Sequence, residues 1–284
     1  MKAKLRLLEM AKVFCSIYDT SEAEAIAGIL LEFYAGIHRS MLIRNPDLHL
    51  ESKVLDNLKM AEQRILQQEP VQYVTGEAYF MKQVFQVSEA VLIPRPETEE
   101  LVYWALDELQ EKSGNEILDI GTGSGCIAIS IKQRFPEVRL TAIDLSAEAL
   151  KMAQLNAKNV QAMVQFEQMD FLEKENWKRL EQYDMIISNP PYIPQSFSST
   201  MDKHVLEYEP TMALFVPDED PLLFYRKIAV FGKSHLKESG MIFLELHAAH
   251  AHETETLFRE MDYHTMLKED MFGKPRMLRA SLRQ

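Results

Sequence analysis

The chain is poor in cysteine and has no long hydrophobic run. Its 284 residues include two cysteines, Cys15 and Cys126, which lie far apart in the sequence. This spacing suggests no disulfide framework and is typical of a reducing compartment. No apolar run approaches the ~20 residues that cross a bilayer, and Glu9 and Lys12 interrupt the stretch that a signal peptide would need. We therefore expect a cytoplasmic protein with no membrane association.

The chain also lacks a surplus of positive charge. It carries 31 Lys and Arg against 43 Asp and Glu, a formal net charge of -12. Proteins that hold DNA through its phosphates usually have a basic surplus or a basic stripe. We expect no direct nucleic-acid binding, whereas a protein substrate, particularly a basic one, is compatible with this charge.

Glycine and proline are scarce in residues 1–70, and apolar residues recur there at helical spacing. The spacing predicts a small helical bundle in which these stripes form the core and Ser21 caps the second helix. Two of the stripes are Leu5, Leu8, Val13 and Ile17, and Ile26, Ile29, Leu30 and Phe33. Residues 71–95 are predicted to form a β-hairpin linker from β-prone runs that include Tyr73 and Val74.

Strands and helices alternate from residue 116 onward, after a helix that begins near Glu97. Such alternation predicts an α/β fold with a parallel sheet covered by helices on both faces. The expected organisation is thus a helical domain (residues 1–70), a linker (71–95) and a larger α/β domain (96–284).

The first motif with chemical content is a glycine turn that follows a short apolar strand. Its residues include Asp119, Gly121, Thr122, Gly123, Ser124 and Gly125. Glycines let backbone approach a ligand at the carboxyl edge of a sheet, and Asp144 at the end of the next strand is able to accept both hydroxyls of a ribose. The combination favours a nucleoside ligand over a plain sharp turn with a surface aspartate.

The second motif, Asn189-Pro190-Pro191-Tyr192, follows another apolar strand. Proline at 190 pushes Asn189 toward an extended conformation. The Asn189 side-chain oxygen and the Pro190 carbonyl are then able to accept one N–H each from a single NH2 group. Tyr192 is able to lie across a flat acceptor. The alternative is a proline-stiffened turn, but the position of the motif favours a binding site for a planar nitrogen.

These two motifs resemble those of class I methyltransferases that act on planar nitrogens. The segment from Ile93 to Glu99, Ile-Pro-Arg-Pro-Glu-Thr-Glu, makes the chain similar to the release-factor glutamine methyltransferases, and the similarity runs over nearly its whole length. The resemblance implies a Rossmann-like mixed sheet with helices on both faces and a small N-terminal helical domain that docks the substrate. It also implies S-adenosylmethionine as donor, S-adenosylhomocysteine as product, and class I peptide chain release factors as partners.

The resemblance also assigns roles to individual residues. The glycines of the turn would lie against the methionine portion of the donor, with Asp144 on its ribose and Asp170 and Phe171 beside its adenine. Asn189, Pro190, Pro191 and Tyr192 would hold the acceptor glutamine. After its fifth strand this chain has Glu245-Leu246-His247, where the family often has Glu-Ile-Gly.

Three alternatives remain open: a glutamine methyltransferase for a large-subunit ribosomal protein, a DNA adenine-N6 methyltransferase, and a catalytically silent translation-factor-binding protein. His247, His250 and His252 fit no familiar zinc spacing, and methyl transfer from a sulfonium needs no metal, so none is expected.

Overall fold

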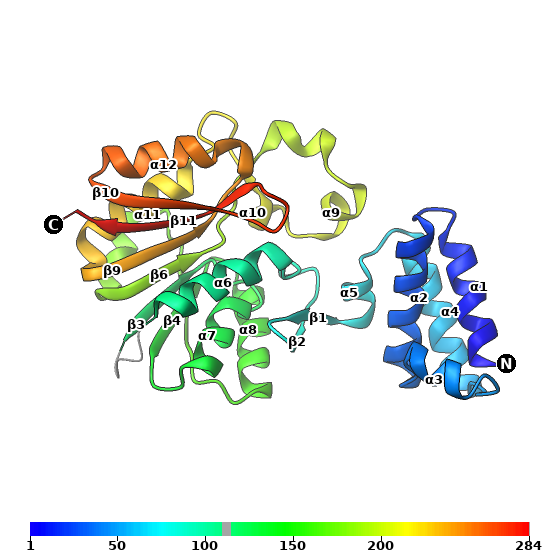
Figure 1. The fold of residues 1–284 in the computed structure, drawn as a ribbon. Coiled ribbons are helices and arrows are strands. Elements are labelled where there is room, and N and C mark those ends of the chain that lie inside the picture. Colours follow the sequence, from blue (N-terminus) through cyan, green and yellow to red (C-terminus); the bar gives the residue numbers. More distant parts are fainter. Residues whose placement is uncertain (110–114, 284) are drawn as a thin grey trace. The chain divides into compact units, whose positions relative to one another are not determined.

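The computed structural model describes residues 1–109 and 115–283 and divides into two compact units (Figure 1). Unit 1 comprises residues 1–77 together with residues 202–208, and unit 2 comprises residues 78–201 and 209–284. The short segment Asp202–Tyr208 thus belongs to the N-terminal unit although it lies in the second half of the sequence. No helix in the described residues is long and apolar enough to cross a membrane.

Unit 1 is a bundle of helices around an apolar core. The helices are α1 (Ala3–Phe14), α2 (Thr20–Ala35), α3 (Arg39–Arg44), α4 (Ser52–Leu66), α5 (Val71–Thr75) and α9 (Lys203–Tyr208). The core includes Met10 and Phe14 of α1, Leu30 of α2, and Leu58 and Ile65 of α4.

The expected core stripe on the first helix is wrong, because the opposite face is buried. Leu5 and Leu8 are 51% and 56% exposed, whereas Leu7, Met10 and Phe14 are in the core. Apolar residues lie on both faces of α1, so their spacing alone did not decide which face packs. On α2, Ile26 and Leu30 are buried as expected, but Ile29 and Phe33 are exposed.

Two further local expectations in this unit are corrected. Asp19, not Ser21, caps α2, since its Oδ1 accepts the Glu22 backbone N–H at 2.9 Å. Tyr73 and Val74 are buried in helix α5, not in a strand. Pro70 fixes the start of this turn of helix, and Gly76 ends it with φ of 73°, a conformation that glycine adopts at little cost.

Unit 2 contains a seven-stranded sheet in the order β10-β11-β9-β6-β3-β4-β5. Its strands are β3 (Glu116–Ile120), β4 (Arg139–Asp144), β5 (Gln165–Gln168), β6 (Tyr183–Ser188), β9 (Leu236–Glu245), β10 (Tyr263–Glu269) and β11 (Pro275–Leu282). Neighbours from β5 to β9 pair in parallel, and β11 runs antiparallel to both β9 and β10. The sheet is therefore mixed, as the resemblance implied. The parallel sheet predicted from the alternation of strands and helices is wrong at this edge, because β11 runs antiparallel between β10 and β9.

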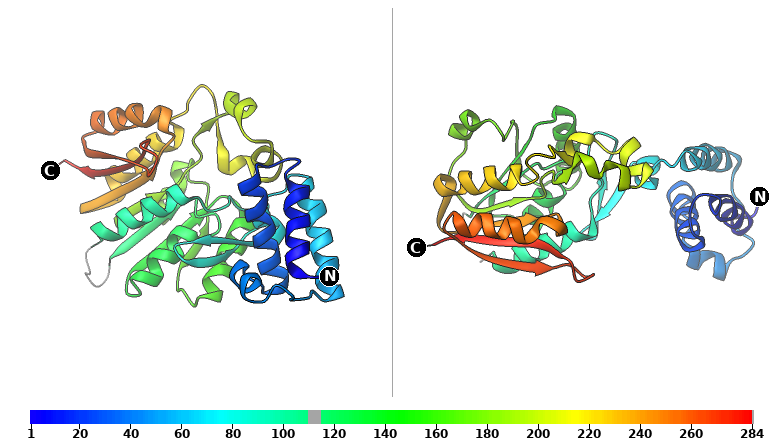
Figure 2. Two further views of the ribbon diagram at one scale, coloured as in Figure 1. Left: turned by 45° about the vertical axis from the view of Figure 1, so that its right-hand side comes forward. Right: turned by 90° about the horizontal axis from the view of Figure 1, so that it is seen from above.

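Helices cover both faces of this sheet (Figures 1 and 2). One face packs against α6 (Pro96–Glu108), α7 (Cys126–Arg134) and α8 (Ala147–Asn159), and the other against α11 (Leu223–His235) and α12 (Ala251–Glu260). Strand β6 shows why both faces are apolar: Ile186 packs into one layer while Met185 and Ile187 pack into the other. Such strands, buried on both sides, read as continuous apolar runs.

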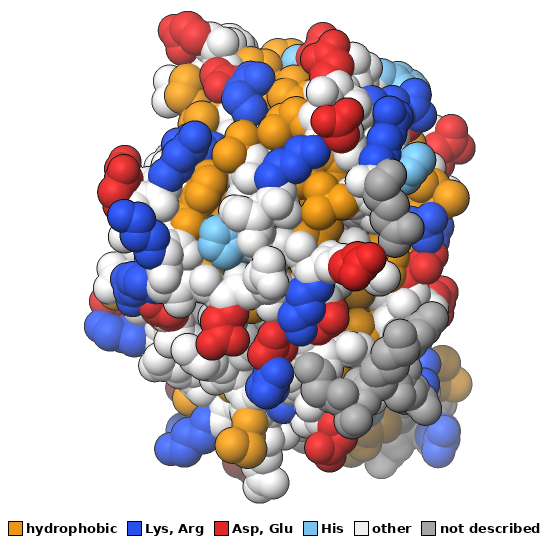
Figure 3. Space-filling view, turned by 90° about the vertical axis from the view of Figure 1, so that its left-hand side faces the viewer, with side chains coloured by type: hydrophobic (Ala, Val, Ile, Leu, Met, Phe, Trp, Pro, Cys, Tyr) orange, Lys and Arg blue, Asp and Glu red, His pale blue; other side chains and the backbone are white. Residues whose placement is uncertain are grey.

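Shorter elements complete unit 2. The hairpin β1 (Glu77–Phe80) and β2 (Gln83–Gln86) precedes α6, as expected from the sequence. The sequence did not predict the parallel pair β7 (Ile193–Pro194) and β8 (Phe215–Val216), nor α10 (Thr211–Leu214) and the 3-10 turns η1 (Lys174–Arg179), η2 (Gln195–Thr200) and η3 (Ala248–His250). On the face drawn in Figure 3, positively and negatively charged side chains are interspersed with apolar ones.

Candidate active site

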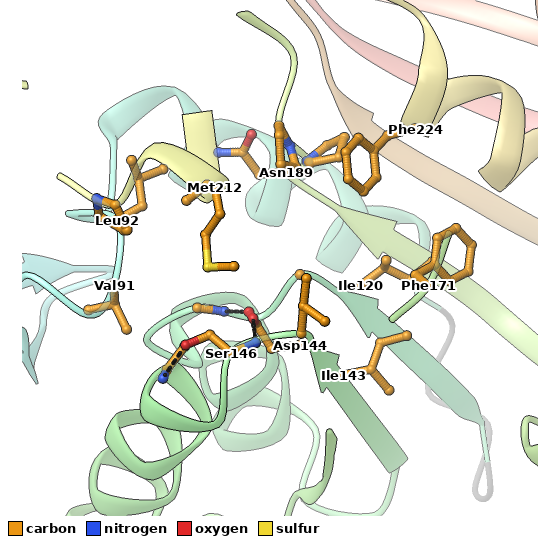
Figure 4. A pocket seen from close by; sticks show the side chains of 18 of the residues that line it. Val91, Leu92, Ile120, Ile143, Asp144, Ser146, Phe171, Asn189, Met212 and Phe224 are labelled. Atoms are coloured by element: carbon orange, nitrogen blue, oxygen red, sulfur yellow. Dashed lines mark hydrogen bonds between the residues drawn. The ribbon is translucent and has the colours of Figure 1, made fainter. Parts of the chain in front are cut away.

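The strand order places two of the predicted motifs at one edge of the sheet. β3 is flanked by β4 on one side and β6 on the other, so successive connections leave β3 in opposite directions. Ligands bind at such switch points, outside the carboxyl ends of the strands. A cavity opens there (Figure 4). Of the predicted residues it is lined by Gly121, Gly123, Asp144, Asp170, Phe171, Asn189, Pro190 and Pro191.

The three glycines of the turn have different surroundings. All have positive φ: 74° at Gly121, 54° at Gly123 and 81° at Gly125. A Cβ added at Gly121 or Gly123 would meet nothing within 4 Å, because both face the cavity. At Gly125 it would lie 2.8 Å from Ile129 Cδ1 and 3.1 Å from Ala153 Cβ. Gly125 is therefore required for packing between α7 and α8, and it does not line the cavity.

Asp144 is fixed by two backbone donors. Its Oδ2 accepts the Gly123 N–H at 2.8 Å, and its Oδ1 accepts the Ser146 N–H at 2.9 Å. Burial raises the pKa of its carboxyl, and these hydrogen bonds oppose that shift. Each carboxylate oxygen still has acceptor capacity toward the cavity.

Asp119, Thr122 and Ser124 lie behind the cavity. Asp119 is fully buried, and its Oδ2 accepts the Thr122 hydroxyl at 2.6 Å. Burial raises the pKa of Asp119 to about 7. None of the three lines the cavity in the described residues, so their contribution there is to the shape of the turn.

Asp170 and Phe171 form another part of the cavity wall. Asp170 Oδ1 accepts the Leu172 backbone N–H at 2.9 Å, which holds the turn after β5. Phe171 packs against Trp177 and Phe231, with ring centroids 5.5 and 5.4 Å away. The wall thus offers an apolar surface next to a carboxylate.

Asn189 lies across the cavity from Asp144, and Met212 projects into the space between them (Figure 4). The Asn189 side-chain Nδ2 donates to Thr98 Oγ1 at 3.0 Å. Because its NH2 end is engaged in this way, the Oδ1 end is left as an acceptor. Tyr192 does not line the cavity, and its hydroxyl donates to Glu245 Oε1 at 3.1 Å.

Glu245 connects the two ends of the Asn-Pro-Pro-Tyr motif. Its other oxygen, Oε2, accepts the Thr98 hydroxyl at 2.5 Å. Its side chain is buried at the end of β9, and burial raises the pKa of the carboxyl to about 7, with the hydrogen bonds from Thr98 and Tyr192 opposing the shift. Neither Thr98 nor Glu245 was predicted as a site residue, although both belong to segments that the sequence analysis singled out.

An ion pair fixes the loop before α6. Arg95 donates to Glu209 Oε1 at 2.5 Å, and the Ile93 backbone N–H donates to Glu209 Oε2 at 3.3 Å. This loop supplies Ala90, Val91 and Leu92 to the cavity, and the chain after Glu209 supplies Met212 and Ala213. These lining residues were also missed, because apolar loop residues carry no pattern of their own.

His247 and His250, which follow β9, are close together but do not form a metal-binding cluster with other side chains in the described residues. The rings of His247 and His250 lie 5.4 Å apart, and His250 Nδ1 is 2.8 Å from Glu253 Oε2. Within residues 1–109 and 115–283 no group of three or more His, Cys, Asp or Glu side chains is arranged to hold a metal ion.

Comparison with known proteins identifies two domain families in the chain. Residues 104–206 match the methyltransferase small domain, and residues 6–76 match the PrmC N-terminal domain. The chain is 38% identical to a release factor glutamine methyltransferase of Flavobacterium psychrophilum, over 97% of both chains. It is 36% identical to one of Bacteroides thetaiotaomicron, over 93% of this chain and 95% of the relative.

Among solved structures, a methyltransferase from Pyrococcus furiosus is 15% identical, with a TM-score of 0.50 over 78% of this chain and 97% of that one. At this identity the likeness shows the fold alone. Fold, glycine turn and family match together define an S-adenosylmethionine-dependent class I methyltransferase. Within that class, the chain belongs to the release factor glutamine methyltransferase family.

Proposed function

We propose that this protein transfers a methyl group from S-adenosylmethionine to the side-chain amide nitrogen (N5) of the glutamine in the Gly-Gly-Gln motif of class I peptide chain release factors. The observation that carries the proposal is Asn189, whose oxygen is a free acceptor at the edge of the cavity while its NH2 end is bound by Thr98. The names of the relatives supply the substrate.

The cavity suits the proposed donor. Gly121 and Gly123 leave space that any Cβ would fill, and Asp144 has acceptor capacity for a ribose diol. Asp170 and the Phe171 ring provide a polar and an apolar surface for adenine. S-adenosylmethionine bound there supplies an electrophilic methyl group on its sulfonium. The C–S bond of the sulfonium breaks as the C–N bond forms, S-adenosylhomocysteine leaves as product, and the methylated nitrogen loses one proton to solvent. We propose that no metal takes part.

The acceptor requires positioning more than activation. An amide nitrogen is a weak nucleophile, since its lone pair is delocalised into the carbonyl. Asn189 Oδ1 and the Pro190 carbonyl would each accept one N–H of the substrate amide and aim its nitrogen at the methyl group. Orientation of this kind supplies several kcal/mol, and the two acceptors also favour the positive charge that develops on the nitrogen. The Tyr192 ring, held through its hydroxyl by Glu245, would support the flat amide.

We further propose that unit 1 docks the release factor and that the enzyme acts in the cytoplasm, without binding membranes or nucleic acid directly. Unit 1 exposes apolar side chains of α1 and α2, among them Leu5, Leu8 and Phe33. Such side chains contribute to the binding free energy when a partner buries them.

The test is methyl transfer from labelled donor to a panel of release factors, ribosomal proteins and DNA. We expect mass spectrometry to place one methyl group on the Gly-Gly-Gln glutamine. Asn189→Ala should reduce the rate about 30- to 1000-fold, through loss of one acceptor and of positioning. Asn189→Asp keeps an acceptor and should retain more activity than the alanine variant. Labelling that survives replacement of the glutamine, or that appears on adenine in DNA, would overturn the assignment.

A further inference from the structure

A single hydrogen-bonded chain links Glu245, Thr98 and Asn189 behind the acceptor side of the cavity. Glu245 Oε2 accepts the Thr98 hydroxyl at 2.5 Å, and Thr98 Oγ1 accepts from Asn189 Nδ2 at 3.0 Å. The three residues come from β9, the first turn of α6 and the loop after β6. Thr98 and Glu245 are 3% and 1% exposed, and neither lines the cavity.

The direction of each hydrogen bond follows from the chemistry at the Glu245 end. An ionised carboxylate has no proton to give, so it only accepts. The single Thr98 hydroxyl proton is therefore used toward Glu245, and Thr98 Oγ1 is an acceptor toward Asn189. Only the NH2 end of the Asn189 amide satisfies that acceptor. The amide oxygen must then face the opposite way, toward the cavity.

We propose that Glu245, acting through Thr98, sets which end of the Asn189 amide faces the substrate. This inference rests on the proposed function, because it concerns the acceptor side of that same site. If the amide turned by 180°, its NH2 group would oppose the NH2 group of a substrate glutamine, and one acceptor of the pair would be lost. Glu245 and Thr98 are thus positioning residues, and they also make the site selective for a group that donates N–H.

Glu245 holds the far end of the motif by the same means. Its Oε1 accepts the Tyr192 hydroxyl at 3.1 Å, so one carboxylate orients both Asn189 and Tyr192. The two bonds engage both carboxylate oxygens, and Glu245 and Thr98 are both buried. A buried donor or acceptor left without its partner is costly, so the arrangement strongly resists reversal of the amide.

The substitution that tests the relay is Thr98→Val, which keeps the branched shape and removes the hydroxyl. We expect kcat to fall about 30-fold while the affinity for S-adenosylmethionine stays within about twofold, since Thr98 does not line the cavity. Thr98→Ser restores the hydroxyl and should recover kcat to within a few-fold. The matched control is Thr254→Val in α12, which removes another fully buried threonine hydroxyl. This hydroxyl donates to the carbonyl of His250, the N-cap residue of α12. The control substitution should leave kcat unchanged.

The acidic limb of the profile of kcat against pH gives a second readout. A purely structural role of Glu245 would not change the position of this limb. Protonation of Glu245 turns one of its two acceptor oxygens into a donor, and the direction of the chain is no longer fixed. Since burial raises the pKa of Glu245 to about 7, kcat should fall as the pH drops below about 7. The titratable groups that face this carboxyl are Glu97 of α6, Arg276 of β11, Tyr192 and Tyr225.

Glu245→Gln separates positioning from ionisation. A glutamine oxygen is still able to accept from Thr98 while its NH2 donates to Tyr192, so we expect partial activity without the acidic limb. Full kcat in Thr98→Val, or an unchanged acidic limb in Glu245→Gln, would overturn the relay. In both cases the wild-type enzyme must methylate the Gly-Gly-Gln glutamine; if it does not, the proposed function fails instead.

Discussion

The three glycines of the turn, Gly121, Gly123 and Gly125, have two different functions in this enzyme. Gly121 and Gly123 face the cavity, whereas Gly125 lets α8 approach α7. All three have positive φ, so alanine costs about 1 kcal/mol of backbone strain at each. The difference between them lies in what the added methyl group would meet.

This difference gives a prediction at the residue scale. Gly121→Ala should weaken S-adenosylmethionine binding at least 10-fold, because the methyl group enters the cavity, and should lower stability by about 1 kcal/mol. Gly125→Ala adds a contact of 2.8 Å with Ile129 and should cost about 2–4 kcal/mol. Calorimetric titration and thermal unfolding measure the two effects. A larger loss of stability in Gly121→Ala than in Gly125→Ala would contradict this division of tasks.

The elements were largely predictable where the signal is local. The short apolar strand before the glycine turn and the apolar strand before Asn189 were predicted from the sequence, and they form β3 and β6. α5 was missed because Tyr73 and Val74 favour strands, while Pro70 and Gly76 fix a turn of helix around them. The link between Thr98 and Glu245 was not predictable, since 147 residues separate them and only the packing of α6 against β9 brings them together.

At the scale of elements, α11 and β10 are joined through a glycine. A Cβ at Gly232 would lie 2.5 Å from the Tyr263 hydroxyl oxygen, which donates to the Ala229 carbonyl at 2.7 Å. Helix propensity favours alanine over glycine by about 1 kcal/mol. Overpacking costs about 1–3 kcal/mol, and the loss of a buried hydrogen bond costs about 1–3 kcal/mol more. Together these two costs are larger than the gain in helix propensity.

We therefore predict that Gly232→Ala destabilises unit 2 by about 1–5 kcal/mol. The matched control is Gly28→Ala in α2, also a helical glycine, whose added methyl group would meet the Arg39 side chain at 3.3 Å. That neighbour is flexible and exposed, so the propensity gain should remain and stability should not fall. Chemical denaturation of both variants measures the contrast. A stabilised Gly232→Ala variant would show that α11 is able to move away from β10.

At the scale of the whole molecule, we propose that unit 1 docks the substrate and that unit 2 carries out the chemistry. The exposed pair Leu5 and Leu8 lies on one face of α1, three residues apart. Exposed substitutions of this kind usually change stability by less than about 0.5 kcal/mol. They are therefore a cleaner probe than removal of the N-terminal residues, which would also take away the helices around α9.

We predict that Leu5→Glu combined with Leu8→Glu raises KM for an intact release factor about 10-fold, through loss of apolar contact. The rate with a short Gly-Gly-Gln peptide, which lacks the part of the release factor that unit 1 is proposed to dock, should not change. Leu155→Glu is the matched control, because Leu155 is a 45% exposed leucine of α8 in unit 2. An unchanged KM for the intact substrate in the double variant would remove α1 from the docking surface.

Because residues 202–208 belong to unit 1, the N-terminal bundle cannot be exchanged between homologous enzymes as one continuous segment. The polypeptide crosses between the units at three points, after residues 77, 201 and 208, and Tyr208 donates its hydroxyl to the Gln67 carbonyl at 3.0 Å. A chimera that takes only the first 77 residues from another species would pair a foreign bundle with the resident α9. Recombination that preserves the bundle therefore has to carry two separate stretches of the gene, or one stretch that also includes residues 78–201 of unit 2.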